Sequence, residues 1–380
     1  MKNFPRQKLV IGLAVAALSW AASAREFFVY VGTYTGALSQ GIYVSRLDSA
    51  TGKLSPPELA AATPSPCYLA VSADEKFLYA DNGVDNFNGQ KASAVSAFAI
   101  DQASGRLTLL NQKSSGGQGA CYVDTDPGAK VLLAANYGDG SVKSFLLNKD
   151  GSIGADGSYI KHLGSGVNPN RQATAHAHYL HTDPSGRFAL ACDLGTDKVV
   201  VYAINRADGT LAEHSFATVP AGSGARHLAF SPDGKFAHVV NEMGCTVTTF
   251  AWDAEAGKLT PVETVSALPP GEELQPGYTG AEILGSGNFV YVTLRGHDSI
   301  TVLTADPQSG RLTFLQNAPC GGKVPRGLGI DPTGRWLIAG NQKADNAVEF
   351  AIDPATGKIS PTGQELKIGS PVDVKFVESK

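Results

Sequence analysis

Four side chains in this sequence are of the types that carry out acid–base chemistry next to a developing negative charge: His178, Arg226, Glu242 and Arg295. An imidazole or a carboxylate can take up and return a proton, and an arginine can stabilise an oxyanion. The four are far apart along the chain, so only the fold can bring them together. Arg226 and Glu242 begin and end the stretch RHLAFSPDGKFAHVVNE, whose middle needs only to pack.

The end of this stretch belongs to an internal repeat with a period near fifty residues. Short apolar strands joined by Gly, Pro and Asp turns at this period are typical of a β-propeller. We therefore expect an all-β, seven-bladed β-propeller with four strands in each blade. The repeats are FVYVGTY (28–34), FLYADNG (77–83), VLLAANY (131–137), FALACDL (188–194), FAHVVNE (236–242), FVYVTLR (289–295) and WLIAGNQ (336–342).

The two ends of the chain predict how the ring closes. Residues 28–34 match the second strand of a blade, and no first strand precedes them. The segment GSPVDVKFV (369–377) resembles PSPCYLAVS (64–72), which starts another blade. The C-terminal strand should therefore complete the N-terminal blade and leave no open sheet edge. Residues 25–380 are then a single propeller domain.

The repeat alignment also maps side chains onto one face of the ring. The first strand of a blade crosses the ring and the second returns, so the start of the first lies beside the end of the second. At the end of the repeat, Glu242 and Arg295 are the charged exceptions. Ten residues before each repeat, the alignment gives Cys67, Cys121, His178, Arg226 and Arg326, with Ala281-Glu282 near this place in blade six and Val372 in the closing blade.

We therefore expect His178, Arg226, Glu242 and Arg295 to form a catalytic set around the central channel, because functional residues are expected where a repeat departs from its own pattern. A structural Arg–Glu ion pair is the alternative. His227 follows Arg226, and strand alternation predicts that it points to the opposite side, where core packing or a contact with another blade is expected.

Further residues on this face are expected to contact a substrate. An Asn or Asp recurs near the end of the repeats and is typical of side chains that satisfy turns. Two members of this set, Asn136 and Asp193, are also candidates for substrate contact. The loop 162–178 could cover the channel, and it supplies two more. The expected substrate-binding residues are Arg171, His176, Asn136, Asp193 and Arg326.

The first 24 residues have the pattern of an export signal: a basic start, an apolar stretch over 9–22, and Ala22-Ser23-Ala24 as a cleavage site. We expect a mature chain that begins at Arg25, is exported, to a periplasm for example, and has no membrane span. Residues 1–24 hold three of the 31 Lys+Arg and none of the 35 Asp+Glu, which leaves a net charge of 28 − 35 = −7. This charge argues against nucleic-acid binding and is compatible with a monomer.

No cofactor is expected. The chain has no HExxH, no GxxxxGK[ST] and no GxSxG motif. The five cysteines are widely spaced without zinc spacing, and buried thiols are the favoured interpretation, with any pairing left open. A metal ion beside Glu242 would be opposed by the two nearby arginines.

Several motifs together resemble the seven-bladed lactonase family, which contains the propeller-type 6-phosphogluconolactonases and the carboxy-muconate lactonizing enzymes. The resemblance implies that a lactone ring is opened or closed without a metal by a His, two Arg and a Glu. By motif these are His178, Arg226, Arg295 and Glu242. The motifs are ARHLAFSPDGKFAHVVNE, AHAHYLHTDPSGRF, CDLGTDKVVVY, LLAANYGDGSV and RGHDSITVL.

Together with export, the resemblance favours hydrolysis of an unphosphorylated aldono-1,5-lactone, such as glucono-1,5-lactone, because sugar-phosphate lactones are cytoplasmic metabolites. Arg226 and Arg295 would stabilise the oxyanion, and either Glu242 or His178 would be the general base, with a slight preference for Glu242. A 6-phosphogluconolactonase with Arg326 or Arg171 binding the phosphate, a muconolactone-forming cyclase, and a non-catalytic ligand- or protein-binding propeller are the alternatives.

Overall fold

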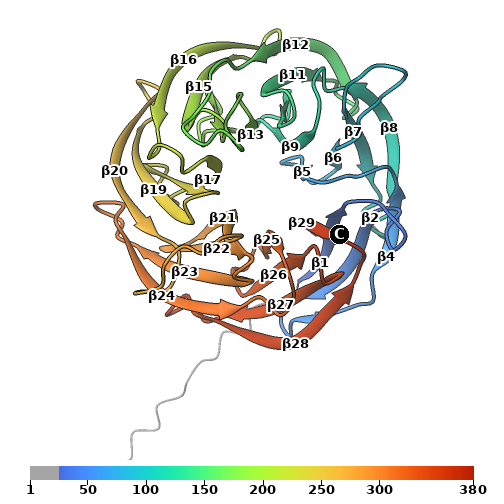
Figure 1. Ribbon diagram of the computed structural model, residues 1–380. Helices are drawn as coiled ribbons and strands as arrows, with labels where there is room; N and C mark the ends of the chain where they lie inside the picture. The colour runs from blue at the N-terminus through green and yellow to red at the C-terminus, as the bar shows by residue number, and fades with distance from the viewer. Residues whose placement is uncertain (1–24) are drawn as a thin grey trace, which may run out of the picture.

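The computed structural model describes residues 25–380, and these form a closed ring of seven antiparallel sheets around a central channel (Figure 1). The predicted export signal, residues 1–24, lies outside the described residues. The first strand of each blade lines the channel, and the fourth lies on the outer rim. The prediction of an all-β, seven-bladed propeller is confirmed.

Blades two to seven each contain four strands in sequence order. Their bounds are β5 (Leu69–Val71), β6 (Phe77–Asn82), β7 (Ala94–Ile100), β8 (Leu107–Ser114); β9 (Ala120–Thr125), β10 (Val131–Asn136), β11 (Ser141–Leu147), β12 (Ile153–Lys161); β13 (Ala177–Thr182), β14 (Phe188–Asp193), β15 (Lys198–Asn205), β16 (Thr210–Thr218); β17 (Ala225–Phe230), β18 (Phe236–Asn241), β19 (Thr246–Asp253), β20 (Lys258–Ser266); β21 (Thr279–Ser286), β22 (Phe289–Arg295), β23 (Ser299–Ala305), β24 (Leu312–Pro319); and β25 (Pro325–Ile330), β26 (Trp336–Asn341), β27 (Asn346–Ile352), β28 (Ile359–Lys367).

The remaining blade is built from both ends of the chain, as the sequence predicts. Its inner strand is β29 (Pro371–Glu378), which pairs antiparallel with β1 (Glu26–Thr33). Its outer part consists of β2 (Gly41–Asp48), β3 (Lys53–Leu54) and β4 (Glu58–Ala62). Seven residues of β1 are matched to β29, and β1 also pairs with β2, so β1 is paired on both sides and presents no open edge.

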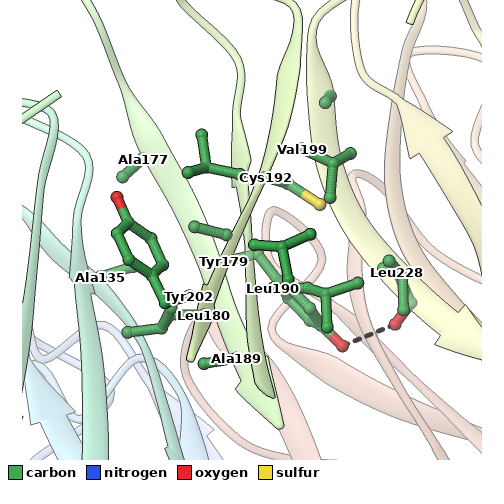
Figure 2. Close-up of a cluster of buried hydrophobic side chains, with 14 of the residues drawn as sticks. Ala135, Ala177, Tyr179, Leu180, Ala189, Leu190, Cys192, Val199, Tyr202 and Leu228 are labelled. Atoms are coloured by element: carbon green, nitrogen blue, oxygen red, sulfur yellow. Dashed lines mark hydrogen bonds between the residues drawn. The ribbon is translucent and has the colours of Figure 1, made fainter. Parts of the chain in front are cut away.

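Neighbouring blades pack through apolar faces and through a recurring glycine contact. Figure 2 shows one such core, where the Tyr179 hydroxyl of blade four donates a hydrogen bond to the Leu228 carbonyl of blade five at 2.7 Å. In six of the blade pairs a glycine of the outer hairpin lies directly against an aromatic residue at or near the start of the second strand of the preceding blade, too close for a side chain. These pairs are Gly52–Trp336, Gly105–Phe28, Gly151–Phe77, Gly257–Phe188, Gly310–Phe236 and Gly357–Phe289.

The inner strands carry a β-bulge at the mouth of the channel. In β17, Ala225 pairs with Asn241 and His227 pairs with Val240, which leaves Arg226 as an extra residue. A bulge of this kind breaks the strand alternation and redirects a side chain. The same one-residue shift occurs at Cys121, His178, Arg326 and Val372, and in blade six Ala281 and Glu282 together stand opposite Thr293. The aligned ring position is therefore a backbone feature that turns these residues toward the channel.

Two further expectations concern the rest of the chain. All five cysteines are buried free thiols, as predicted. Within residues 25–380 there is no helix long and apolar enough to cross a membrane.

Candidate active site

Glu242 is the centre of a cluster of charges at one mouth of the channel. Its Oε2 atom accepts hydrogen bonds from Arg226 Nε at 3.0 Å and lies 3.0 Å from Arg295 Nη2. Its Oε1 atom accepts a hydrogen bond from Arg171 Nη2 at 2.6 Å. Three arginines from three different parts of the ring thus converge on one carboxylate.

The fold supplies each of these side chains from a different element. Arg226 is the bulged residue of β17, and Glu242 follows directly after β18, the strand paired with it. Arg295 ends β22 in the next blade, and Arg171 comes from the loop between β12 and β13. Arg226 is held further by a hydrogen bond from its Nη1 atom to the Ala281 carbonyl at 2.5 Å. The predicted neighbours Arg226, Glu242 and Arg295 are therefore in direct contact.

The charges in this cluster perturb one another. Burial by itself would raise the pKa of Glu242, but Arg295 and Arg226 outweigh it and hold this pKa well below the usual range. Burial and the neighbouring Arg295 and Arg326 lower the pKa of Arg226 to about 10. Glu242 is therefore ionised and Arg226 protonated at neutral pH, which makes Glu242 a weak base.

His178 completes the predicted set, at the bulge of β13. It is buried, and it lines a small cavity together with Arg226 and Arg326. Burial and the adjacent Arg226 lower the pKa of His178 well below its usual value, so the ring is neutral at physiological pH. The neutral imidazole is consequently the better proton acceptor in this site.

His227 is buried and contacts other blades, as predicted, but the prediction that it points to the opposite side from Arg226 is wrong, because both residues line the same small cavity. The bulge at Arg226 cancels the alternation, so His227 also faces the channel interior. Its Nε2 atom lies 3.1 Å from His178 Nδ1, and its Nδ1 atom lies 2.8 Å from Glu282 Oε1. The repeat alignment places Glu282 near the ring position and gives it no role. Its orientation depends on the bulge of β21, where two residues stand opposite Thr293, and the sequence alone does not show this bulge.

The remaining expected substrate contacts divide into two groups. His176 stacks on Tyr137 with ring centroids 4.5 Å apart, and the Tyr137 hydroxyl accepts a hydrogen bond from Arg171 at 3.2 Å. Arg326 is partly buried and has its guanidinium 5.5 Å from the centre of the Tyr34 ring. Arg326 has no carboxylate partner among residues 25–380, so it is available to an anionic group.

Asn136 and Asp193, in contrast, are held by hydrogen bonds within the protein. Both are fully buried. Asn136 donates to the Ser115 carbonyl and the Ser141 hydroxyl, and Asp193 is bonded to His162 at 2.6 Å and to the backbone N–H of His176. These hydrogen bonds satisfy groups of the surrounding loops, and contact of Asn136 or Asp193 with a substrate stays a prediction.

The cavities around the channel are unequal. The small cavity behind the arginine cluster has a volume of about 10 Å³, whereas a cavity of about 650 Å³ opens at the other mouth of the channel. Tyr68 and Glu282 line both, and so form part of the wall between them. In the described part of the chain, no group of three or more His, Cys, Asp and Glu side chains could hold a metal ion.

Comparison with known proteins shows to which family this chain belongs. Residues 28–376 match the family model described as "Lactonase, 7-bladed beta-propeller". The chain belongs to the propeller lactonase family. It is 36% identical to a 6-phosphogluconolactonase of Bacillus subtilis over 93% of this chain and 99% of that protein.

Solved structures of this family are also similar in three dimensions. A periplasmic gluconolactonase of Pseudomonas aeruginosa has a TM-score of 0.87 and 33% identity, with 93% of this lactonase-family chain and 100% of that chain covered. A putative 6-phosphogluconolactonase of Bacteroides fragilis has a TM-score of 0.85 and 33% identity over 93% of this chain and 98% of that one. The resemblance inferred from the motifs is confirmed at the level of the family.

Proposed function

We propose that this chain is an exported lactonase that hydrolyses an aldono-1,5-lactone, with glucono-1,5-lactone as its main substrate. The observation that carries the proposal is the convergence of Arg226, Arg295 and a neutral His178 at one mouth of the channel. The similarity to a periplasmic gluconolactonase and the signal pattern of residues 1–24 support an exported enzyme that meets an unphosphorylated sugar lactone.

The geometry favours His178 over Glu242 as the general base. Three arginines already occupy the Glu242 carboxylate, while Nδ1 is the one ring nitrogen of His178 with a hydrogen-bond partner among residues 25–380. We assign Nε2 of His178 to the attacking water. Glu242 then orders the arginines, a role that reverses the slight preference drawn from the sequence.

The hydrolysis can be written with these groups alone. The water oxygen bonds to the lactone carbonyl carbon while a water proton passes to His178 Nε2. The resulting oxyanion is stabilised by Arg226 and Arg295 in a site largely screened from solvent. The intermediate collapses with cleavage of the bond to the ring oxygen, which takes the proton back from His178. The product is the open hydroxy acid, whose carboxyl group releases its proton to solvent.

The decisive experiment follows acid release from glucono-1,5-lactone by residues 25–380 in weak buffer, with spontaneous hydrolysis subtracted. We expect His178→Gln and Glu242→Gln each to lower kcat by about 100-fold or more. Glu349→Gln, a fully buried glutamate in blade seven, is the matched control and should leave kcat unchanged. A chelator should have no effect, because the proposed steps need no metal.

Other outcomes would redirect the assignment. No acceleration by the wild-type protein would overturn hydrolysis of glucono-1,5-lactone. Sensitivity to the chelator would contradict the metal-independent mechanism. Full activity of His178→Gln would remove His178 as the base.

The unpaired Arg326 favours a second candidate, the 6-phospho lactone, because a guanidinium without a carboxylate partner suits a phosphate. Under this alternative, Arg326→Met would lower kcat/KM for the phosphorylated lactone by about 100-fold or more and leave glucono-1,5-lactone nearly unaffected. Comparing the two lactones on wild-type and Arg326→Met protein distinguishes the candidates. Equal losses on both substrates would show that Arg326 does not read a phosphate.

A further inference from the structure

A chain of three buried side chains runs from the site into the wall of the channel. Glu282 contacts His227, and His227 contacts His178, at 2.8 and 3.1 Å. All three are at most 4% exposed. They come from three successive inner strands, β21, β17 and β13, each at or next to its bulge.

The hydrogen-bonding capacity of these groups fixes the direction of the chain. Glu282 Oε1 also accepts the backbone N–H of Ile283 at 3.1 Å, so this oxygen is an acceptor. His227 must then donate from Nδ1 to Glu282. A neutral imidazole carries one N–H, which leaves Nε2 of His227 as an acceptor and makes Nδ1 of His178 the donor. Nε2 of His178 is left with a free lone pair.

We propose that His227 and Glu282 are positioning residues that hold His178 in the tautomer required of a general base, with Nδ1 protonated and Nε2 open to the attacking water. The proposal rests on the proposed function for its chemistry, but the tautomer itself is a property of the resting protein. Neither His227 nor Glu282 touches the reacting atoms.

The surroundings of His227 are built to keep its ring in one orientation. Three tyrosine rings enclose it, with centroids 5.6, 5.2 and 5.3 Å from the imidazole for Tyr68, Tyr122 and Tyr179. Tyr68 is itself covered by Lys375, whose Nζ atom lies 4.0 Å from the ring centre. An imidazole held by two hydrogen bonds and three rings has little freedom to flip, so the direction of the chain is preserved.

The charges that face the chain oppose protonation of its histidines. The pKa of His227 lies well below its usual value. Burial is the largest cause, and Arg226 of β17 and Arg326 of β25 lower this pKa further. Burial raises the pKa of Glu282 to about 7, while Arg226 and Lys375 act in the opposite direction. Because Oε1 accepts the Ile283 N–H, a proton taken up by Glu282 belongs on Oε2, and Oε1 continues to accept from His227.

The chain also matters after the water has been deprotonated. His178 then carries two protons and a positive charge, which its burial and Arg226 disfavour. The hydrogen bond from Nδ1 to His227, continued to Glu282, stabilises that cation in place. Outer-shell partners of this kind contribute about 10- to 100-fold to activity at metal-bound histidines.

The test combines kinetics with nitrogen NMR of histidine-labelled residues 25–380. In the wild-type protein, the His178 signals, assigned with His178→Gln, should show a protonated Nδ1 and an unprotonated Nε2. His227→Phe keeps a ring in the tyrosine cage but removes both contacts, and should lower kcat by about 10-fold or more with KM nearly unchanged. His227→Gln, which can again offer an acceptor to His178, should recover part of the loss.

His238→Gln is the matched control, because His238 is equally buried in β18 and, within the described part of the protein, its side chain bonds only to Thr249, which is not one of the three linked residues. It should leave kcat and the His178 spectrum unchanged. A protonated Nε2 on His178 in the wild-type protein would overturn the proposal, as would full kcat in His227→Phe. The spectrum needs no substrate, so an inactive protein with the expected tautomer would reject the proposed function and leave this inference standing.

Discussion

The three arginines around Glu242 limit what this carboxylate can do. A carboxylate that accepts hydrogen bonds from Arg226 and Arg171 and forms an ion pair with Arg295 has both oxygens occupied and little affinity for a proton. Its presence keeps guanidinium groups close together that would otherwise repel each other. At the scale of the residue, proton transfer therefore falls to His178, and charge stabilisation falls to the arginines.

This division of roles predicts the pH profile. The groups that face His178 are Arg226, Arg326, His227 and Glu242, and burial with Arg226 lowers the pKa of His178 well below 6.5. A base with a lowered pKa stays unprotonated as the pH falls through the ordinary histidine range. We expect kcat to change by less than about threefold between pH 7.5 and 6, and to fall only at lower pH. Stopped-flow hydrolysis at constant ionic strength measures this.

The contrary result would be a single-proton loss of activity centred near 6.5 or above. That profile would indicate a solvated histidine, or a base other than His178. Glu282→Gln serves as a control here, because it removes the group with a pKa of about 7 and leaves any titration of His178 visible.

The bulge explains at the scale of the element why the site was only partly predictable. Repeat alignment placed His178, Arg226 and Arg326 on one face, because it compares equivalent positions and needs no knowledge of the backbone. The orientation of His227 was predicted from strict alternation, which a single extra residue in β17 reverses. The burial of Asn136 and Asp193 could not be predicted, since a buried amide or carboxylate in a turn and an exposed one have the same sequence pattern.

A second recurring element, the glycine that lies against an aromatic residue of the preceding blade, gives a stability prediction. Gly257 has φ +59°, and a Cβ placed on it would lie 2.5 Å from Phe188 Cε1. Gly363 has φ +85° with open space around it, so it isolates the backbone cost alone. We expect Gly363→Ala to cost about 1 kcal/mol and Gly257→Ala about 2 to 4 kcal/mol in denaturant unfolding. Equal losses would show that Phe188 moves aside and that this contact does not join the blades.

The joint between the two chain ends is the feature that belongs to the whole molecule. The sequence predicted this closure because residues 28–34 lack a first strand and residues 369–377 supply one. The backbone pairing of β29 with β1 is accompanied by contacts with blade two. For example, the Leu69 N–H of β5 donates a hydrogen bond to the Asp373 carboxylate of β29 at 2.8 Å. Removing β29 would thus expose an edge of β1 and also disturb blade two.

Truncation tests how far the ring depends on that joint. We expect residues 25–370 to be recovered mostly as aggregate, with any soluble fraction melting at least about 10 °C lower than residues 25–380. Residues 25–378, which keep all of β29, are the matched control and should melt like the full chain. A synthetic peptide of residues 369–380 should restore part of the lost stability by adding the missing strand. A soluble 25–370 protein with an unchanged melting temperature would contradict a closure-dependent ring.

The repeated bulge has a consequence for how such a molecule can acquire new activities. Five blades share a one-residue bulge at this position, and each of these bulges turns one side chain toward the channel. Three of these bulges hold His178, Arg226 and Arg326, while the others hold Cys121 and Val372. Single substitutions at these bulge positions can therefore change the side chains that line the channel without changing the backbone that holds them. An acidic, basic or metal-ligating side chain introduced at Val372 would stand on the same type of bulge that holds His178 and Arg226.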